Sequence, residues 1–257
     1  MSKKTSTAAS SFTPDQAWAL AGQAFAEGRF AEADKLCAGL VNALPAHAHG
    51  WHLRALAALA LNKPKPALLH LAHVKDAPDL LPAVAQARGR AHLGLGQWAE
   101  AVASFQQTLG YKADDAGTHH LLALALLGQG DGTTARQYFR RATLLDPTLG
   151  PAHYELGVLA LAAGDAPQAV TAFAAAAQHL PGVAQVFNNL ALAQQAVGDG
   201  PAAEQSLRKA LELDANYAEA WFNLAHLLQA QGDAVQADAA RAKALRLNPA
   251  LGQVQAV

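Results

Sequence analysis

Small and apolar residues recur along the chain with a period of 34 residues, from Pro14 to Leu251, without an insertion or deletion. One position of every period holds only alanine or glycine, and the position twelve residues later is always alanine. The first column is Ala21, Ala55, Gly89, Ala123, Gly157, Ala191 and Ala225, and the second is Ala33, Ala67, Ala101, Ala135, Ala169, Ala203 and Ala237. Small side chains at fixed positions let two helix backbones approach closely, so each period predicts a closely packed helix pair.

Helix-breaking residues divide each period into two halves. The first half ends at Gly28, Gly96, Gly130, Gly164, Gly198 and Gly232, and in the second period at Asn62, the residue next best at left-handed backbone angles. The second half is followed by Pro45, Pro147, Pro181 and Pro249 in four of the periods. The pattern therefore predicts a first helix of about fourteen residues that ends at the glycine column and a second helix that runs to the proline column. Thr13, Pro14 and Gln16 predict a capping box at the start of the first helix.

These columns predict a single all-α array from residue 14 to residue 251. Its seven repeats are residues 14–47, 48–81, 82–115, 116–149, 150–183, 184–217 and 218–251. Each helix pair has too small a core to stand alone, so neighbouring pairs must stack into a solenoid. We expect residues 1–13 to form a disordered tail and residues 252–257 to form a short second tail.

One bulky column fills the gaps between the small residues: Leu71, Phe105, Phe139, Phe173 and Leu207. Cys37 and Arg241 occupy this column in the first and last repeats. We expect Cys37 to be a structural thiol in the core. Arg241 predicts that the last helix is the polar terminal cap that a solenoid requires, although truncation from a longer protein is the alternative.

Composition strengthens the helical prediction and limits the function. The 64 alanines favour helix over strand, and 19 basic against 20 acidic residues give a formal net charge of -1. Residues 142–207 contain no Lys or Arg, so no basic stripe for nucleic acid is expected. The apolar runs are shorter than a membrane span, and the first residues show no apolar leader segment. We therefore expect a cytoplasmic protein with neither nucleic-acid partner nor membrane span.

The columns resemble those of the tetratricopeptide repeat family. The last repeat carries the family pattern as Trp221, Leu224-Ala225, Leu228, Ala237, Ala244 and Pro249, and the fifth carries it as Leu156-Gly157, Ala169, Phe173, Ala176 and Pro181. Arg54 and Arg88 depart from it, because the family has leucine there. The resemblance implies a right-handed α-solenoid of seven helix–turn–helix units whose first helices line a concave groove.

The resemblance also implies which side chains meet a partner. Groove residues come from fixed positions of the first helices, spaced at i, i+4 and i+7 on one helix face. The expected partner-binding residues are His52, Gln86, Arg90, His120, Leu124, Leu127, Tyr154, Val158, Leu161, Asn188, Asn189, Gln195, Phe222, Asn223 and His226. The middle of this groove is apolar with a polar edge, which suits apolar side chains of a partner. Its C-terminal part is rich in amides, which suit a partner's backbone.

The function expected from these residues is that of a non-catalytic interaction scaffold, or adaptor, which binds a peptide segment or a partner protein. The alternative is a substrate-targeting arm or accessory subunit of a glycosyltransferase or sulfotransferase acting in trans. An asparagine ladder typical of such arms is matched only by Asn189 and Asn223. The lysine and arginine clamp that chaperone-binding members use is not matched. Self-association through the ends of the array is a third possibility.

Catalytic, cofactor and metal sites are not expected. No phosphate-binding loop, dinucleotide fingerprint or Gly-x-Ser-x-Gly sequence occurs. His49 and His52, like His70 and His73, are three residues apart, but the two pairs fall on different helices and no carboxylate completes either of them. An enzyme would also need a second fold outside the array. We therefore predict no enzymatic activity, no cofactor and no metal.

Overall fold

The computed structural model describes residues 12–253. The predicted tails lie outside the described residues, apart from Phe12 and Thr13 at one end and Gly252 and Gln253 at the other. The described residues are helical, with no strand between residues 12 and 253, so the prediction of an all-α fold is confirmed. None of the helices in this range is long and apolar enough to cross a membrane.

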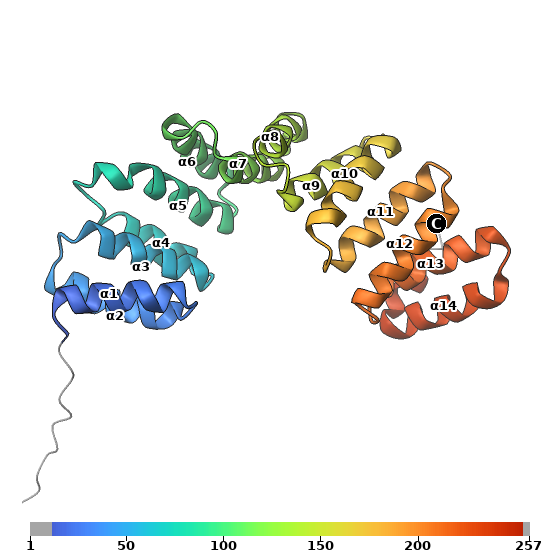
Figure 1. Ribbon diagram of the computed structural model, residues 1–257, viewed down its shortest axis with the longest axis horizontal. Coiled ribbons are helices and arrows are strands. Elements are labelled where there is room, and N and C mark those ends of the chain that lie inside the picture. Colours follow the sequence, from blue (N-terminus) through green and yellow to red (C-terminus); the bar gives the residue numbers. More distant parts are fainter. Residues whose placement is uncertain (1–11, 254–257) are drawn as a thin grey trace, which may run out of the picture. The chain divides into compact units, whose positions relative to one another are not determined.

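The helices alternate between the first and second members of successive pairs (Figure 1). The first members are α1 (Pro14–Ala26), α3 (Ala48–Ala60), α5 (Leu81–Gly94), α7 (Ala116–Gly128), α9 (Gly150–Ala162), α11 (Ala184–Ala196) and α13 (Ala218–Gln231). The second members are α2 (Phe30–Ala43), α4 (Pro64–Leu71), α6 (Trp98–Tyr111), α8 (Gly132–Leu145), α10 (Ala166–His179), α12 (Gly200–Leu213) and α14 (Ala234–Leu247). Two 3-10 turns, η1 (Pro78–Leu80) and η2 (Pro249–Gln253), complete the order.

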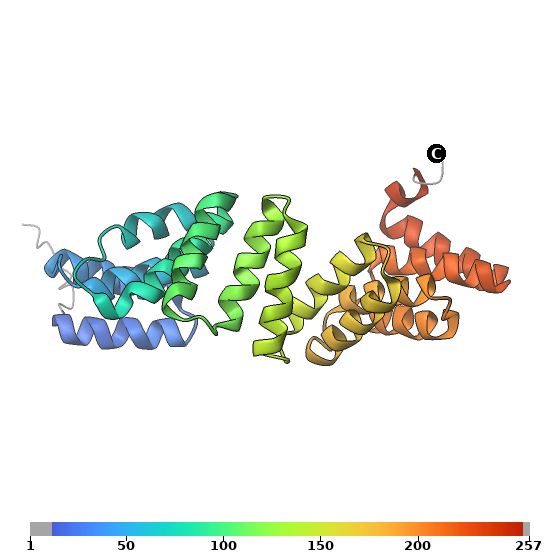
Figure 2. The same ribbon diagram turned by 90° about the horizontal axis from the view of Figure 1, so that it is seen from above.

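The chain divides into two compact units, and the boundary in the sequence falls between Asp131 and Gly132. The N-terminal unit contains α1 to α7, and the C-terminal unit contains α8 to α14. Inside each unit every helix packs on the next helix in the chain, as Figures 1 and 2 show. First helices also contact the first helices of neighbouring repeats: α1 with α3, α3 with α5 and α5 with α7 in one unit, and α9 with α11 and α11 with α13 in the other. Each unit is thus a stretch of α-solenoid.

The core of each helix pair is built from the small columns and the bulky column. Ala21, Ala33 and Cys37 of the first repeat are fully buried, and the same holds for Phe105 and Phe173. Phe105 packs against the backbone of Gly89, and Phe173 packs against the backbone of Gly157. The small columns are therefore the surfaces on which the bulky side chains lie.

Glycine ends the first helices because the chain must turn through the left-handed region there. The six glycines of this column have φ between 67° for Gly96 and 87° for Gly232. Asn62 has φ of 55° at the equivalent place, so it performs the same turn with a side chain attached. At the start of α1, Thr13 and Gln16 form the expected capping box.

The second helix of repeat two departs from the pattern. We expected it to continue to the end of its period, but α4 stops at Leu71, and residues 72–80 form a linker that includes η1. Ala77, ahead of Pro78, has φ of -130° and ψ of 76°, outside the helical region, and Asp76 has φ of 52°. A proline cannot donate a backbone hydrogen bond, and the residue before it avoids helical angles, so the linker cannot continue the helix through residue 78.

Candidate functional site

The expected partner-binding residues fall into two groups, one in each compact unit. His52, Gln86, Arg90, His120, Leu124 and Leu127 lie on α3, α5 and α7 of the N-terminal unit. The remaining nine lie on α9, α11 and α13 of the C-terminal unit. We name the second group, without the buried Asn188, the C-terminal face: Tyr154, Val158, Leu161, Asn189, Gln195, Phe222, Asn223 and His226.

A row of hydrogen-bonded side chains crosses the three first helices of the C-terminal unit. Asn223 Nδ2 donates to Asn188 Oδ1 at 2.9 Å, which joins α13 to α11. Asn188 Nδ2 donates to Asn189 Oδ1 at 3.3 Å, and Asn189 Nδ2 donates to the Tyr154 hydroxyl at 2.9 Å, which joins α11 to α9. The amides that were expected to contact a partner's backbone therefore bind one another first.

Asn188 is buried in this row, with only 4% of its surface exposed. It occupies the central place, because it accepts from Asn223 and donates to Asn189. Its role in the structure is to connect the helices, whereas Asn189 and Asn223 remain half-buried. A carboxamide can donate two hydrogen bonds and accept two, so Asn189 keeps one N–H and one lone pair beyond the row.

The apolar end of the C-terminal face lies around Tyr154. The Tyr154 ring makes an edge contact with Phe173, with ring centroids 5.7 Å apart. Burial raises the pKa of the Tyr154 hydroxyl, and burial also raises the pKa of the neighbouring Glu155 carboxyl. Val158, one helical turn further along α9, has 37% of its surface exposed. This end of the face can therefore offer an apolar contact beside a phenol hydroxyl.

The opposite end of the C-terminal face contains an aromatic pair on α13. The Phe222 and His226 rings meet edge to face with centroids 4.5 Å apart. Phe222 is half-buried, whereas His226 is exposed. Leu161 and Gln195 are half-buried on α9 and α11. The face thus combines apolar, amide and imidazole groups without a formal charge.

Among the corresponding residues of the N-terminal unit, the Gln86 amide already forms hydrogen bonds within the protein. Gln86 Nε2 on α5 lies 3.2 Å from Asp115 Oδ2 and 2.9 Å from Thr118 Oγ1. Asp115 is the N-cap of α7 and accepts from the Thr118 backbone N–H. Gln86 therefore joins α5 to the start of α7.

Imidazoles and leucines form the rest of this N-terminal group. Burial lowers the pKa of both His52 and His120, which favours their neutral forms. Leu124 and Leu127 are half-buried, and Arg90 is exposed. Arg90 therefore brings a positive charge to this group of residues.

The histidines that sequence spacing paired as metal candidates have other contacts. His73 stacks on the Trp51 indole, with centroids 4.3 Å apart and planes 20° apart, and His70 lies 5.9 Å from the same ring. The Arg54 guanidinium lies 5.6 Å from the Trp51 centroid and forms an ion pair with Asp34 at 2.8 Å. Arg54, which replaces the leucine of the family pattern, is thus held by a tryptophan and a carboxylate.

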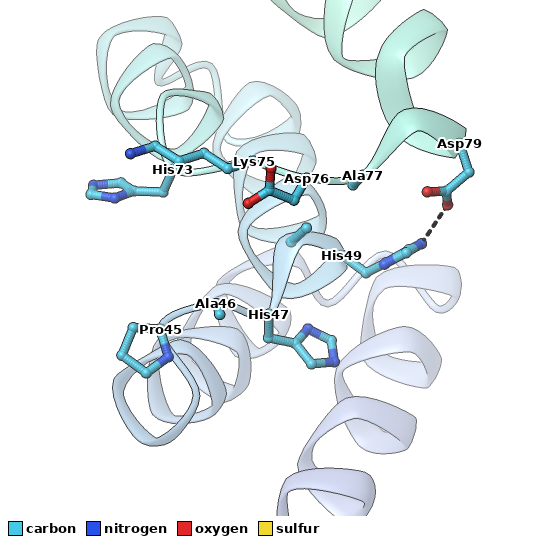
Figure 3. Close-up of a pocket in the computed structure, with 10 residues that line it drawn as sticks. Pro45, Ala46, His47, His49, His73, Lys75, Asp76, Ala77 and Asp79 are labelled. Carbon is cyan, nitrogen blue, oxygen red and sulfur yellow. Dashed lines mark hydrogen bonds and ion pairs between the residues drawn. The ribbon is translucent and has the colours of Figure 1, made fainter.

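A polar pocket of about 520 Å³ lies where the linker after α2 meets the linker after α4 (Figure 3). Its walls include His47, His49, His73, Lys75, Asp76 and Asp79. His49 Nε2 lies 2.9 Å from Asp79 Oδ2, and Figure 3 shows this contact between two of the lining residues. Across residues 12–253, no three His, Cys, Asp or Glu side chains are grouped to hold a metal ion. The pocket follows from the early end of α4, which the residue columns did not reveal.

The single cysteine is enclosed in the core of the N-terminal unit. Cys37 has none of its surface exposed. Burial raises the pKa of its thiol to about 11, so the thiolate is scarce near neutral pH. A low-pKa, accessible thiolate is what a reactive cysteine requires, and Cys37 has neither property. Its environment is that of the structural thiol that we expected.

Solved structures share this fold at low sequence identity. The C-terminal part of a TPR repeat-containing protein from Cytophaga hutchinsonii aligns over 90% of this chain and 95% of its own, with a TM-score of 0.70 and 20% identity. A crystal structure of MamA aligns over 70% of this chain and 98% of its own, with a TM-score of 0.61 and 17% identity. MamA from Desulfovibrio magneticus RS-1 aligns over 68% and 97%, with a TM-score of 0.60 and 19% identity. No curated protein sequence matches the chain.

Sequence models of the tetratricopeptide repeat match most of the chain. One matches residues 87–149 and again 120–184, a second matches 184–217, and a third matches 206–239. Together these matches run without a gap from residue 87 to residue 239. The helix pairs, the glycine turns and the small columns of both units agree with them. The chain therefore belongs to the tetratricopeptide repeat family.

Proposed function

We propose that this protein is a non-catalytic interaction scaffold that binds an extended segment of a partner protein on the C-terminal face. The observation that carries the proposal is the hydrogen-bonded row from Asn223 through Asn188 and Asn189 to Tyr154. The row fixes its amides before a partner arrives, which lowers the entropy lost on binding. The spare N–H and carbonyl groups of Asn189 and Asn223 can then pair with a peptide backbone.

Helix spacing matches the repeat distance of an extended peptide. Neighbouring packed helices are about 8–10 Å apart, and an extended chain advances about 3.3 Å per residue. Amides on adjacent first helices therefore match every third residue of a peptide that crosses α9, α11 and α13. Val158 lies beside this line and provides an apolar contact. A segment with apolar side chains and few charges suits a face without formal charge.

A substitution at Val158 tests this proposal. Peptides that bind the full chain are first selected from a random peptide library, and their affinities are then measured by calorimetry. Val158→Arg places a long charged side chain on the exposed part of the face. We expect it to lower the affinity for these peptides by about tenfold or more, equivalent to about 1.4 kcal/mol of binding free energy.

Val235→Arg is the matched control, because Val235 is 83% exposed at the start of α14, outside the C-terminal face. It should change the affinity of the same peptides by less than about twofold. Equal affinity of all selected peptides for the native chain and for Val158→Arg would contradict the proposal. Mass spectrometry of proteins co-purified with the native chain distinguishes an adaptor from the alternative, an accessory subunit for a glycosyltransferase or sulfotransferase.

A further inference from the structure

A second pocket lies in the C-terminal unit and shares no residue with the C-terminal face. It lies between α12, α13 and α14 and has a volume of about 380 Å³. Its lining comprises Arg208, Trp221, Leu224, Leu228, Gln236, Ala239, Ala240 and Lys243. Leu224 and Leu228 are almost fully buried, so the pocket has an apolar floor. Sites for small ligands are typically roughly 300–1,000 Å³, mostly apolar, with a few polar groups.

A comparison of repeat seven with repeat two, which lies 170 residues earlier in the chain, explains this pocket. Trp51 and Trp221 occupy the same column, and both indoles are held in the same way. Trp51 Nε1 donates to the Pro45 carbonyl at 2.9 Å, and Trp221 Nε1 donates to the Ala215 carbonyl at 3.0 Å. The two rings therefore have the same anchor, six residues earlier in the chain.

The surroundings of the two rings differ. Trp51 is covered by the stacked His73 ring, and the Arg54 guanidinium lies over it. The counterparts of His73 and Arg54 in repeat seven are Lys243 and Leu224. The counterpart of His70 is Ala240, which removes another ring. Within residues 12–253, Trp221 has no stacked ring or guanidinium, and its indole instead forms a wall of the pocket.

Positive charge borders this apolar pocket. Arg208 contacts Glu204 through Nε at 2.9 Å and through a terminal nitrogen at 2.8 Å, which leaves further N–H donors on its guanidinium. Lys243 has no ion pair with any residue of the described range. No Asp or Glu is among the described residues that line the pocket. The charges therefore favour an anionic group attached to an apolar body.

We propose that this pocket binds a small apolar carboxylate. The apolar body lies between the Trp221 indole and the floor formed by Leu224 and Leu228. The carboxylate pairs with Lys243 and with the spare donors of Arg208, as carboxylates do with ammonium and guanidinium groups. This site does not depend on peptide binding by the C-terminal face.

The test uses the full-length chain with 4-phenylbutyrate as probe and calorimetry as readout. We expect saturable binding of 4-phenylbutyrate, and binding about fivefold or more weaker for 4-phenylbutanol, which has the same apolar body without the charge. Lys243→Gln should lower the affinity for 4-phenylbutyrate by about fivefold and leave the affinity for 4-phenylbutanol unchanged. Absence of saturable binding to the native chain would overturn the proposal, and equal affinities of the two probes would overturn its anionic part.

A second variant fills the pocket with the rings found in repeat two. Ala240→His combined with Lys243→His should cover Trp221 and lower the affinity for 4-phenylbutyrate by at least about tenfold. The matched control is Ser104→His with Gln107→His, the same columns of repeat three, where Ala85 stands in the tryptophan column. This control should bind the probe like the native chain.

Nuclear magnetic resonance of the native chain keeps the test decisive if the filled variant does not fold. The chain has four tryptophans, so four indole N–H signals can be assigned and followed during titration. The signal of Trp221 should shift on addition of 4-phenylbutyrate, while those of Trp18, Trp51 and Trp98 stay unchanged. A shift of another indole without a shift of Trp221 would place the ligand elsewhere and overturn the proposal.

Discussion

Single residues of the small columns lie in direct contact with the phenylalanines of the core. A Cβ atom added to Gly157 would lie 2.7 Å from the Phe173 ring, closer than such atoms approach in proteins. Phe173 is fully buried and cannot move into solvent. We therefore predict that Gly157→Ala lowers the free energy of unfolding by about 1–3 kcal/mol, measured by denaturant titration.

Gly39→Ala is the matched control for this prediction. Gly39 lies within α2, and a Cβ atom there would meet no heavy atom within 4 Å. The same substitution should then stabilise the chain by up to about 1 kcal/mol, because alanine favours helix over glycine. A stabilising effect of Gly157→Ala would contradict the packing described for Phe173.

At the residue scale, the sequence predicts which small side chains pack against bulky ones better than it predicts hydrogen-bond partners. The periodic columns indicated where small residues would meet bulky ones, and Gly157 with Phe173 lies as expected. The amide-rich region was also visible, but not its connections. Asn188 and Asn189 are adjacent and alike in sequence, yet only Asn188 is buried, because it lies between the amides of Asn223 and Asn189. Such pairings depend on distances between helices, which no residue column contains.

At the scale of helices, the turn that ends each first helix gives a prediction at Asn62. This residue has φ of 55°, whereas glycine makes the equivalent turn in the other six repeats. A side chain is unfavourable in the left-handed region, and asparagine tolerates it only in part. We expect Asn62→Gly to raise the melting temperature, with a gain of up to about 1 kcal/mol in unfolding free energy. Gly198→Ala, at a position with φ of 82°, should instead lower the melting temperature. An unchanged or lower melting temperature of Asn62→Gly would contradict this account.

Helix ends could be predicted in every repeat but the second. Repeats three and six also lack a proline in the second column, yet α6 ends at Tyr111 and α12 at Leu213, two residues before that column. In repeat two, α4 ends at Leu71, eight residues before Asp79. Pro78 stands one residue earlier than that column position and forces Ala77 out of helical angles. The stack of His73 on Trp51 lies in this shortened segment, and its counterpart is missing around Trp221. The two pockets therefore arise where repeats differ, which is information that a period alone does not contain.

At the scale of the whole molecule, seven repeats of one length predicted an α-solenoid, and the described residues form it in two compact units. The division lies between Asp131 and Gly132, where one helix pair of the fourth repeat is split. The residue columns continue through this point without an insertion or deletion. Local columns specify helix pairs, whereas compact units depend on the contacts of many helices together, so the sequence period did not reveal the division.

Contacts between neighbouring helices set how far a local disturbance spreads. Stability in a repeat array is close to a sum over repeats and their interfaces, so a strained repeat destabilises itself and its neighbours first. Gly157→Ala strains the contact between α9 and α10, and α10 packs on α11. Hydrogen exchange followed by mass spectrometry should therefore show faster exchange in α9, α10 and α11 of this variant. Exchange in α1 to α6 of the N-terminal unit should stay as in the native chain, and a uniform rise across both units would show that they unfold as one cooperative body.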